Sequence, residues 1–154
     1  MNWTIGQVAD ALGASFAGGD GRVSGYSINS RSLNKGEMFF AVRAERDGHD
    51  FVAGAFGQGA SAAVVALDWP VPRGLAGKAL LRVGDPRQAL ADLARAQRRA
   101  WGRSVLAVTG SSGKTTFKEA AAAMLATKYR TAKNVGNLNN DLGVPLTLLR
   151  MAED

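Results

Sequence analysis

Cysteine is absent from this chain of 154 residues, and histidine occurs once, at position 49. Without cysteine the chain can form no disulfide scaffold, no cysteine-ligated zinc finger and no thiol-based catalytic centre. Long hydrophobic runs are absent too. The longest, around residues 60–67, is well short of the roughly 20 residues that a membrane-spanning helix requires. The N-terminus has no basic region followed by an apolar core, so we expect no secretory signal and a cytoplasmic location.

The composition is that of a folded protein with an excess of positive charge. Hydrophobic residues make up 46% and charged residues 21%, which excludes a disordered tail. The net charge of +6 would suit a nucleic acid, an anionic membrane surface or a phosphorylated small molecule. The basic residues cluster at Arg95, Arg98, Arg99 and Arg103. Such a cluster also occurs on an ordinary solvated helix face, so both interpretations stay open.

The first 84 residues read as a small α/β domain. Thr4 and Gln7 have the spacing of a helix-capping box, and Gly13 follows the end of that helix. A wholly apolar run at 62–67 predicts a strand that is buried on both faces, as in parallel sheets. The expected elements are helices over 4–12 and 50–59 and strands over 23–30, 37–43, 62–67 and 79–83.

A connecting helix and a second unit follow. Asp85 can cap a helix that opens at Pro86 and ends before Gly102. We therefore expect three parts: a domain over 1–84, a connecting helix over 85–102 and a second domain over 103–154. The second is expected to hold a strand at 104–109, a helix at 114–127, a strand at 129–132 and a helical turn from Pro145. Alternating strands and helices predict an α/β fold with a mainly parallel sheet.

The strongest chemical signal lies at residues 109–116, where an apolar segment runs into a glycine- and serine-rich turn and then into Lys114 and Thr115. Glycines let backbone N–H groups converge on an anion, and a helix N-terminus adds its positive dipole end. This pattern predicts a nucleotide phosphate loop, with Lys114 on the β- and γ-phosphates and the Thr115 hydroxyl on Mg²⁺. The usual pattern has a glycine where Val108 stands, so the spacing is shorter than usual.

Two further groups of polar residues could bind a ligand. One is the asparagine-rich loop 136–145, whose amides can both donate and accept hydrogen bonds. Asparagine and glycine also favour plain turns, so a simple connector is equally consistent with this loop. The other comprises residues 29–31 and 43–51, which follow predicted strands, where open α/β sheets bind ligands.

These motifs together resemble the Mur ligases, the ATP-dependent amide-bond-forming enzymes of peptidoglycan synthesis. Residues 109–116 resemble their shortened phosphate loop, which accounts for the displaced glycine. The loop 136–149 resembles the member that joins D-alanyl-D-alanine to UDP-N-acetylmuramoyl-tripeptide. Segments 30–31, 36–39 and 47–51 resemble its N-terminal, UDP-sugar-binding domain. Asn29 stands where the family usually has aspartate, and Ala44 where it has glycine.

The resemblance implies an ATP-dependent ligase with ATP and Mg²⁺ as cofactors and the muramoyl tripeptide and D-alanyl-D-alanine as substrates. It implies Lys114 and Thr115 as catalytic residues. The implied ATP site comprises Gly110, Ser111, Ser112, Gly113, Lys114, Thr115 and Thr116. The implied substrate contacts are Ser30, Arg31, Glu45, Arg46, Asn139 and Asn140. The family's acidic Mg²⁺ ligand and carbamylated lysine would lie beyond Asp154, so we expect this stretch of chain to be inactive alone.

Three other functions are consistent with parts of the sequence. A Mur ligase that adds a single amino acid would share the phosphate loop. A small kinase would share it too, but would need an arginine-rich lid, and no such segment follows Lys114. A non-catalytic module that binds nucleotide or nucleic acid could be centred on residues 95–103, although Trp101 is the one aromatic residue there.

Overall fold

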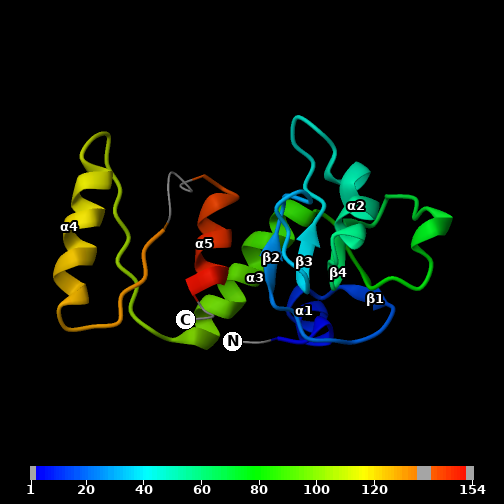
Figure 1. Cartoon of the computed structure of the whole chain (residues 1–154), viewed down its shortest axis with the longest axis horizontal. Coiled ribbons are helices and arrows are strands. Elements are labelled where there is room, and N and C mark those ends of the chain that lie inside the picture. The colour runs from blue at the N-terminus through cyan, green and yellow to red at the C-terminus, as the bar shows by residue number, and fades with distance from the viewer. Residues whose placement is uncertain (1–2, 135–139, 152–154) are drawn as a thin grey trace.

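A five-stranded sheet forms one end of the molecule (Figure 1) in the computed structural model, which describes residues 3–134 and 140–151. The strand order is β1-β5-β4-β3-β2. The pairs from β2 to β5 are parallel, and β1 pairs with β5 antiparallel. The strands are β1 (Ser15–Ala17), β2 (Gly25–Ser27), β3 (Glu37–Phe40), β4 (Ala62–Ala66) and β5 (Leu80–Val83). The mainly parallel α/β sheet predicted from the sequence is confirmed.

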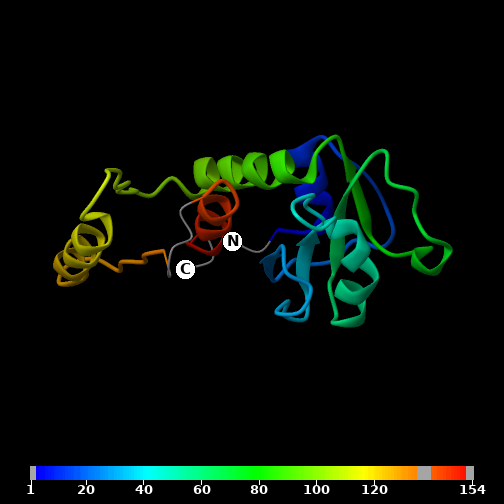
Figure 2. The same cartoon turned by 90° about the horizontal axis from the view of Figure 1, so that it is seen from above.

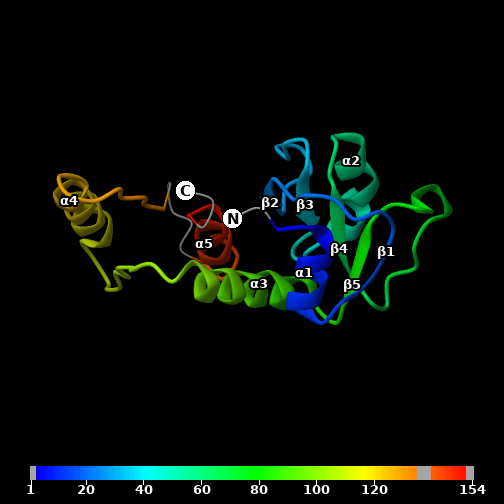
Figure 3. The ribbon, with the colours of Figure 1, turned by 90° about the horizontal axis from the view of Figure 1, so that it is seen from below.

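Helices cover both faces of this sheet (Figure 3). One face packs against α1, α3 and α5, and the opposite face packs against α2. The helices are α1 (Ile5–Leu12), α2 (Val52–Gly57), α3 (Pro86–Trp101), α4 (Lys114–Ala126) and α5 (Gly143–Met151), with short 3₁₀ turns at η1 (Gly48–Phe51) and η2 (Arg73–Leu75). Within the described residues no helix has the length and apolar character needed to cross a membrane.

The central strand β4 is buried on both faces, as its unbroken apolar run predicts. Ala62 and Val64 belong to the core on the α1–α3–α5 side, whereas Ala63 and Val65 belong to the core on the α2 side. Alternate residues of a strand point to opposite faces, so both faces of β4 must be apolar.

Local capping fixes the ends of α1 and α3. The Thr4 hydroxyl accepts a hydrogen bond from the Gln7 N–H at 3.2 Å, and the Gln7 side chain accepts one from the Thr4 N–H at 3.0 Å. Asp85 accepts from the Arg87 N–H at 2.8 Å, and Gly102 ends α3 in a left-handed conformation. The two helices therefore begin and end where the sequence predicts.

Several predicted elements are wrong in extent or type. The strand predicted over 23–30 is limited to β2, the one over 37–43 ends at Phe40, and the helix predicted over 50–59 opens as a 3₁₀ turn. The sequence patterns did not predict β1. This exposed edge strand forms because β5 offers it hydrogen-bonding partners.

The strands predicted over 104–109 and 129–132 are also wrong: the structure assigns neither segment to a strand. A strand needs a neighbour to complete its ladder, and the described chain pairs neither segment with one. Val105 and Leu106 are accordingly exposed to 43% and 61%. Both segments lead to and from α4, which lies at the opposite end of the molecule from the sheet (Figures 1 and 2).

The last helix, α5, begins at Gly143, ahead of the expected Pro145, and packs against α3 and β2. Leu146 and Leu149 are buried in the same core as α1 and α3. Residues 143–151 therefore complete the core of the N-terminal sheet, although they lie in the stretch assigned to a second domain. The division into 1–84, 85–102 and 103–154 stays a prediction.

Candidate phosphate and substrate site

The phosphate-loop residues form an exposed turn at the start of α4. Gly113 is the residue before the helix and has a φ of +74°, a left-handed conformation that favours glycine. No side chain in the described part of the chain caps this helix end. The first N–H groups of a helix have no partner within it, so this end can receive an anion.

Lys114 begins α4 and folds back over the loop. Its Nζ donates hydrogen bonds to the Gly110 carbonyl and, at 3.3 Å, to the Ser111 carbonyl. The ammonium is therefore held over the turn that precedes the helix. Thr115 and Thr116 lie in the first turn of α4 and are exposed, as are Ser111 and Ser112.

A cavity of about 810 Å³ lies next to α4. Its walls include Val105, Leu106, Lys118 and Leu125, and none of the residues 110–116 lines it. Lys118 and Lys133 pair with Glu119, and these hydrogen bonds hold the pKa of Glu119 below its ordinary value. The cavity follows from the unpaired apolar segments beside α4 and does not overlap the candidate nucleotide site.

The candidate substrate residues follow the carboxyl ends of β2 and β3, which are neighbouring parallel strands. Ser30 and Arg31 come after β2, and the Asn29 side chain accepts a hydrogen bond from the Arg31 N–H at 3.0 Å. Glu45 and Arg46 lie at the exposed tip of the loop after β3. The topology therefore brings these four residues to one edge of the sheet.

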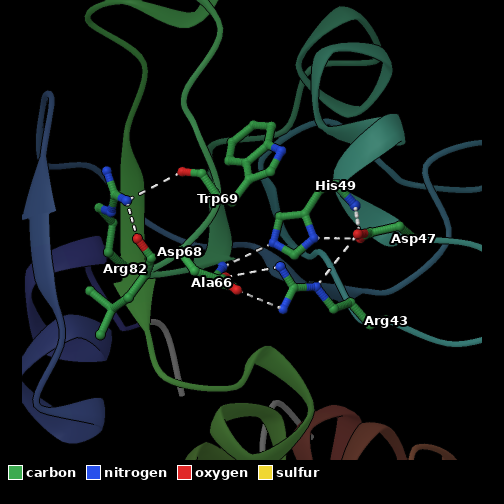
Figure 4. Close-up of polar contacts among 8 residues, drawn as sticks. Arg43, Asp47, His49, Ala66, Asp68, Trp69 and Arg82 are labelled. Atoms are coloured by element: carbon green, nitrogen blue, oxygen red, sulfur yellow. Dashed lines mark hydrogen bonds and ion pairs between the residues drawn. The ribbon is translucent and has the colours of Figure 1, made fainter.

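The loop after β3 is held by an ion-pair network centred on Arg43 (Figure 4). The Arg43 guanidinium binds both oxygens of Asp68, at 2.9 and 3.2 Å, and lies 3.5 Å from Asp47. The hydrogen bond from Arg43 lowers the pKa of Asp68 below its ordinary value. Partial burial raises the pKa of Asp47, but hydrogen bonds from His49 and the nearby Arg43 charge outweigh it, so the net shift is downward.

The side chain of the single histidine, His49, links the loop after β3 to β4. His49 is buried, its Nδ1 lies 2.5 Å from Asp47, and its Nε2 accepts a hydrogen bond from the Ala66 N–H at 2.9 Å. An accepting Nε2 places the proton on Nδ1, facing the Asp47 carboxylate. The Trp69 ring packs against the imidazole, with centroids 5.1 Å apart (Figure 4). His49 is therefore a structural residue within the β3–β4 region.

The described end of the asparagine-rich loop leads into α5, which packs against β2 of the sheet. Asn140 caps this helix by accepting a hydrogen bond from the Gly143 N–H at 2.7 Å. The next residue, Asp141, pairs with Arg87 at 2.5 Å. Arg87 was not among the residues that the sequence singled out, because no local pattern links two positions that are 54 residues apart. Asn139 lies outside the described residues.

The structure thus brings the β3 loop and the start of α5 close to one another, because Arg87 contacts both. It does not bring the phosphate loop to them: α4 and its preceding turn lie apart from the sheet, beyond α5 (Figure 1).

Known proteins match both the N-terminal part of this chain and the part that contains the phosphate loop. Residues 108–154 match the Mur ligase middle domain. The chain is 40% identical, over 98% of its length, to the UDP-N-acetylmuramoyl-tripeptide–D-alanyl-D-alanine ligase of Escherichia coli, and 41% identical, over 86% of its length, to the ligase of the same name from Bacillus subtilis. It covers 32% and 29% of those two proteins.

Solved structures match as well. The crystal structure of MurF from Acinetobacter baumannii superposes with a TM-score of 0.86 at 35% identity, covering 97% of this chain and 33% of that one. MurF ligase from Thermotoga maritima, solved in complex with ADP, superposes with a TM-score of 0.70, covering 81% of this chain and 28% of that one. The chain therefore belongs to the Mur ligase family and spans about a third of the length of the relatives that it matches.

Proposed function

We propose that this chain supplies the UDP-sugar-binding segments and the phosphate loop of a ligase that joins D-alanyl-D-alanine to UDP-N-acetylmuramoyl-tripeptide. The observation that carries the proposal is the identity of 40% over 98% of the chain to a ligase of that name. The uncapped N-terminus of α4, with Lys114 folded over the preceding turn, supports the nucleotide part of the proposal.

The chemistry requires that a carboxylate be made electrophilic. A carboxylate oxygen of the tripeptide attacks the γ-phosphorus of ATP, and ADP leaves with the electron pair of the broken P–O bond. The amine of D-alanyl-D-alanine then attacks the acyl carbon, the C–O bond to phosphate breaks, and the nitrogen releases one proton as the amide forms. The first transfer develops negative charge on the phosphoryl oxygens, which a cation at Lys114 would stabilise.

The residues that would hold ATP are Gly110, Ser111, Ser112, Gly113, Lys114, Thr115 and Thr116, through main-chain N–H groups, the ammonium and hydroxyls. The Thr115 hydroxyl would hold Mg²⁺. Its exposure in the first turn of α4 fits that role. The described residues contain no group of three or more His, Cys, Asp or Glu side chains placed to hold a metal. Within the described residues, the Thr115 hydroxyl is therefore the group that we propose for Mg²⁺, which would neutralise phosphate charge when bound.

The muramoyl substrate would lie along the sheet edge and the start of α5. Ser30, Arg31 and Arg46 would contact the uridine diphosphate end, where arginine suits phosphate groups. Glu45 would contact the same substrate. The asparagines at 139 and 140 would contact the sugar–peptide part. This assignment of the two groups to the two ends of the substrate is what the resemblance to the Mur ligases implies.

Nucleotide binding to Lys114→Ala tests the ATP site. Charge-assisted hydrogen bonds contribute roughly 1.5–3 kcal/mol, so the variant should bind ATP about 10- to 100-fold more weakly in titration calorimetry with Mg²⁺. Lys128→Ala is the matched control, because Lys128 follows the far end of the same helix and lies over Tyr129. Equal ATP affinity of Lys114→Ala and the unmodified chain would refute the assignment.

A further inference from the structure

One arginine contacts both candidate substrate loops. Arg87 lies in the first turn of α3, and its Nη1 is 2.5 Å from an Asp141 carboxylate oxygen. Its Nη2 donates a hydrogen bond to the Arg43 main-chain carbonyl at 3.4 Å. Arg43 opens the loop that presents Glu45 and Arg46, and Asp141 directly follows Asn140. The planar guanidinium therefore uses two different N–H groups on two segments that are far apart in the sequence.

The helix itself gives no reason for an arginine at this position. The N-terminus of a helix is the positive end of its dipole, so a cation in the first turn is unfavourable there. The first turn of α3 has no acidic residue, and the carboxylate of the N-cap residue Asp85 accepts a hydrogen bond from the Arg87 main-chain N–H. The Asp141 carboxylate, which α5 brings to the start of α3, provides the compensation.

Each of the two loops has its own hydrogen-bonded anchor, so Arg87 joins two segments that are each held locally. The β3 loop is closed by the hydrogen bond from the Ala44 N–H to the Arg46 carbonyl at 3.1 Å and is tied down through the Arg43 ion pairs. The start of α5 is fixed by Asn140, which accepts from the Gly143 N–H. The packing of α5 against α3 and β2 brings the two segments together, and Arg87 provides polar contacts that join their exposed ends.

We propose that Arg87 is a positioning residue that sets the spacing between the β3 loop and the start of α5, and so lets one ligand engage both. The inference rests on the proposed function, in which the uridine diphosphate end meets the first loop and the sugar–peptide part meets the second. A ligand that spans both loops gains affinity from their correct spacing, whereas a ligand that contacts only one loop does not.

Two ligands of different length test this proposal. Arg87→Gln should weaken binding of UDP-N-acetylmuramoyl-tripeptide about fivefold, the scale of one exposed ion pair, and leave binding of UDP unchanged. Arg87→Lys should recover part of the loss, since an ammonium keeps the charge beside Asp141 but lacks the fork that reaches both partners. Arg95→Gln is the control, because Arg95 pairs with Asp92 inside α3. Equal effects on both ligands, or equal effects of Arg87→Gln and Arg95→Gln, would overturn it.

A measurement without ligand separates this proposal from the proposed function. Asp141→Asn should speed hydrogen exchange of the Ala44 amide, on the other side of the bridge, and should have no such effect when Arg87 is already Gln. Additive effects of the two substitutions on that amide would disprove the bridge. If the unmodified chain binds neither ligand while the exchange rates remain coupled, the bridge stands and the proposed function fails.

Discussion

At the scale of single residues, the His49 ring takes over the role of a strand carbonyl. The Ala41 N–H, directly after β3, donates to the Val64 carbonyl at 3.0 Å, whereas the Ala66 N–H, two residues further along β4, donates to His49 at 2.9 Å. The chain after β3 can therefore diverge from β4 while the buried Ala66 N–H still has a hydrogen-bond acceptor. This arrangement also explains why Asp47 and His49 are two residues apart: Asp47 accepts from both the His49 N–H and its ring.

Replacing His49 with Leu should lower the free energy of unfolding by about 1–3 kcal/mol, because the buried Ala66 N–H loses its acceptor. Urea denaturation followed by circular dichroism measures this change. Asp50→Asn is the control, since Asp50 is the exposed neighbour of His49 in the same 3₁₀ turn, and it should leave the midpoint unchanged. A midpoint for His49→Leu equal to that of Asp50→Asn would show that the ring's hydrogen bond is unimportant.

The pKa of Asp68 predicts an acid-sensitive contribution to stability. Arg43 lowers the pKa of the Asp68 carboxyl below 3.8 in the folded chain. The unfolded state therefore binds the proton more tightly, so the contribution is present above about pH 4 and is lost as the pH falls through the folded pKa. Asp68→Asn should make the loss of stability between about pH 5 and pH 2 shallower. The check is a series of denaturant midpoints across that range. The carboxyl is largely exposed, so the change should be small.

At the scale of elements, short local signals decide where helices begin. Asp85 accepts from the Arg87 N–H, and Pro86 fills the first position of α3, where its missing N–H costs nothing. The same logic operates at α1 with Thr4 and Gln7. At α4 the pattern differs: a glycine precedes the helix, and no side chain among the described residues caps it, which is the arrangement expected where an anion is to be received.

Removing the cap of α3 should therefore be costly. Asp85→Ala is expected to lower the free energy of unfolding by about 0.5–2 kcal/mol, since one helix N–H loses its acceptor. Thermal and urea melts provide the measurement. Gln88→Ala serves as the comparison, because Gln88 is an exposed residue one turn further along the same helix. An Asp85→Ala chain as stable as Gln88→Ala would mean that the cap contributes nothing.

At the scale of the whole molecule, α5 joins the end of the chain to the core of the N-terminal sheet. Leu149 is fully buried, and Leu146 lies beside it in the core shared by α1 and α3. The sheet is therefore covered on one face by three helices that come from the beginning, the middle and the end of the described chain (Figure 3). The start of α5 then lies where Arg87 can reach it.

Leu149→Ala tests this packing. A buried leucine replaced by alanine leaves a cavity, so the free energy of unfolding should fall by about 2–5 kcal/mol. Val144→Ala, on the exposed side of α5, is the control and should change stability by less than about 0.5 kcal/mol. If both variants have the same unfolding midpoint as the unmodified chain, the packing of α5 does not contribute to the stability of the core.

The sequence alone determined the features that depend on neighbours along the chain. The caps of α1 and α3, the double-sided burial of β4 and the glycine-rich turn before Lys114 each arise from residues within a few positions of one another. The same turn provides part of the resemblance to the Mur ligases. Phosphate binding needs consecutive main-chain N–H groups, so the residues that form such a site are consecutive in the sequence.

Only the tertiary structure decided the features that depend on distant partners. The exposed edge strand β1 forms where β5 offers a ladder, while the apolar segment 104–109 stays unpaired because the described chain places no strand beside it. Likewise, the contacts of His49 with Ala66 and of Arg87 with Asp141 join residues 17 and 54 positions apart. Hydrogen bonds and ion pairs act through space, and a linear pattern cannot specify which distant groups folding brings within their reach.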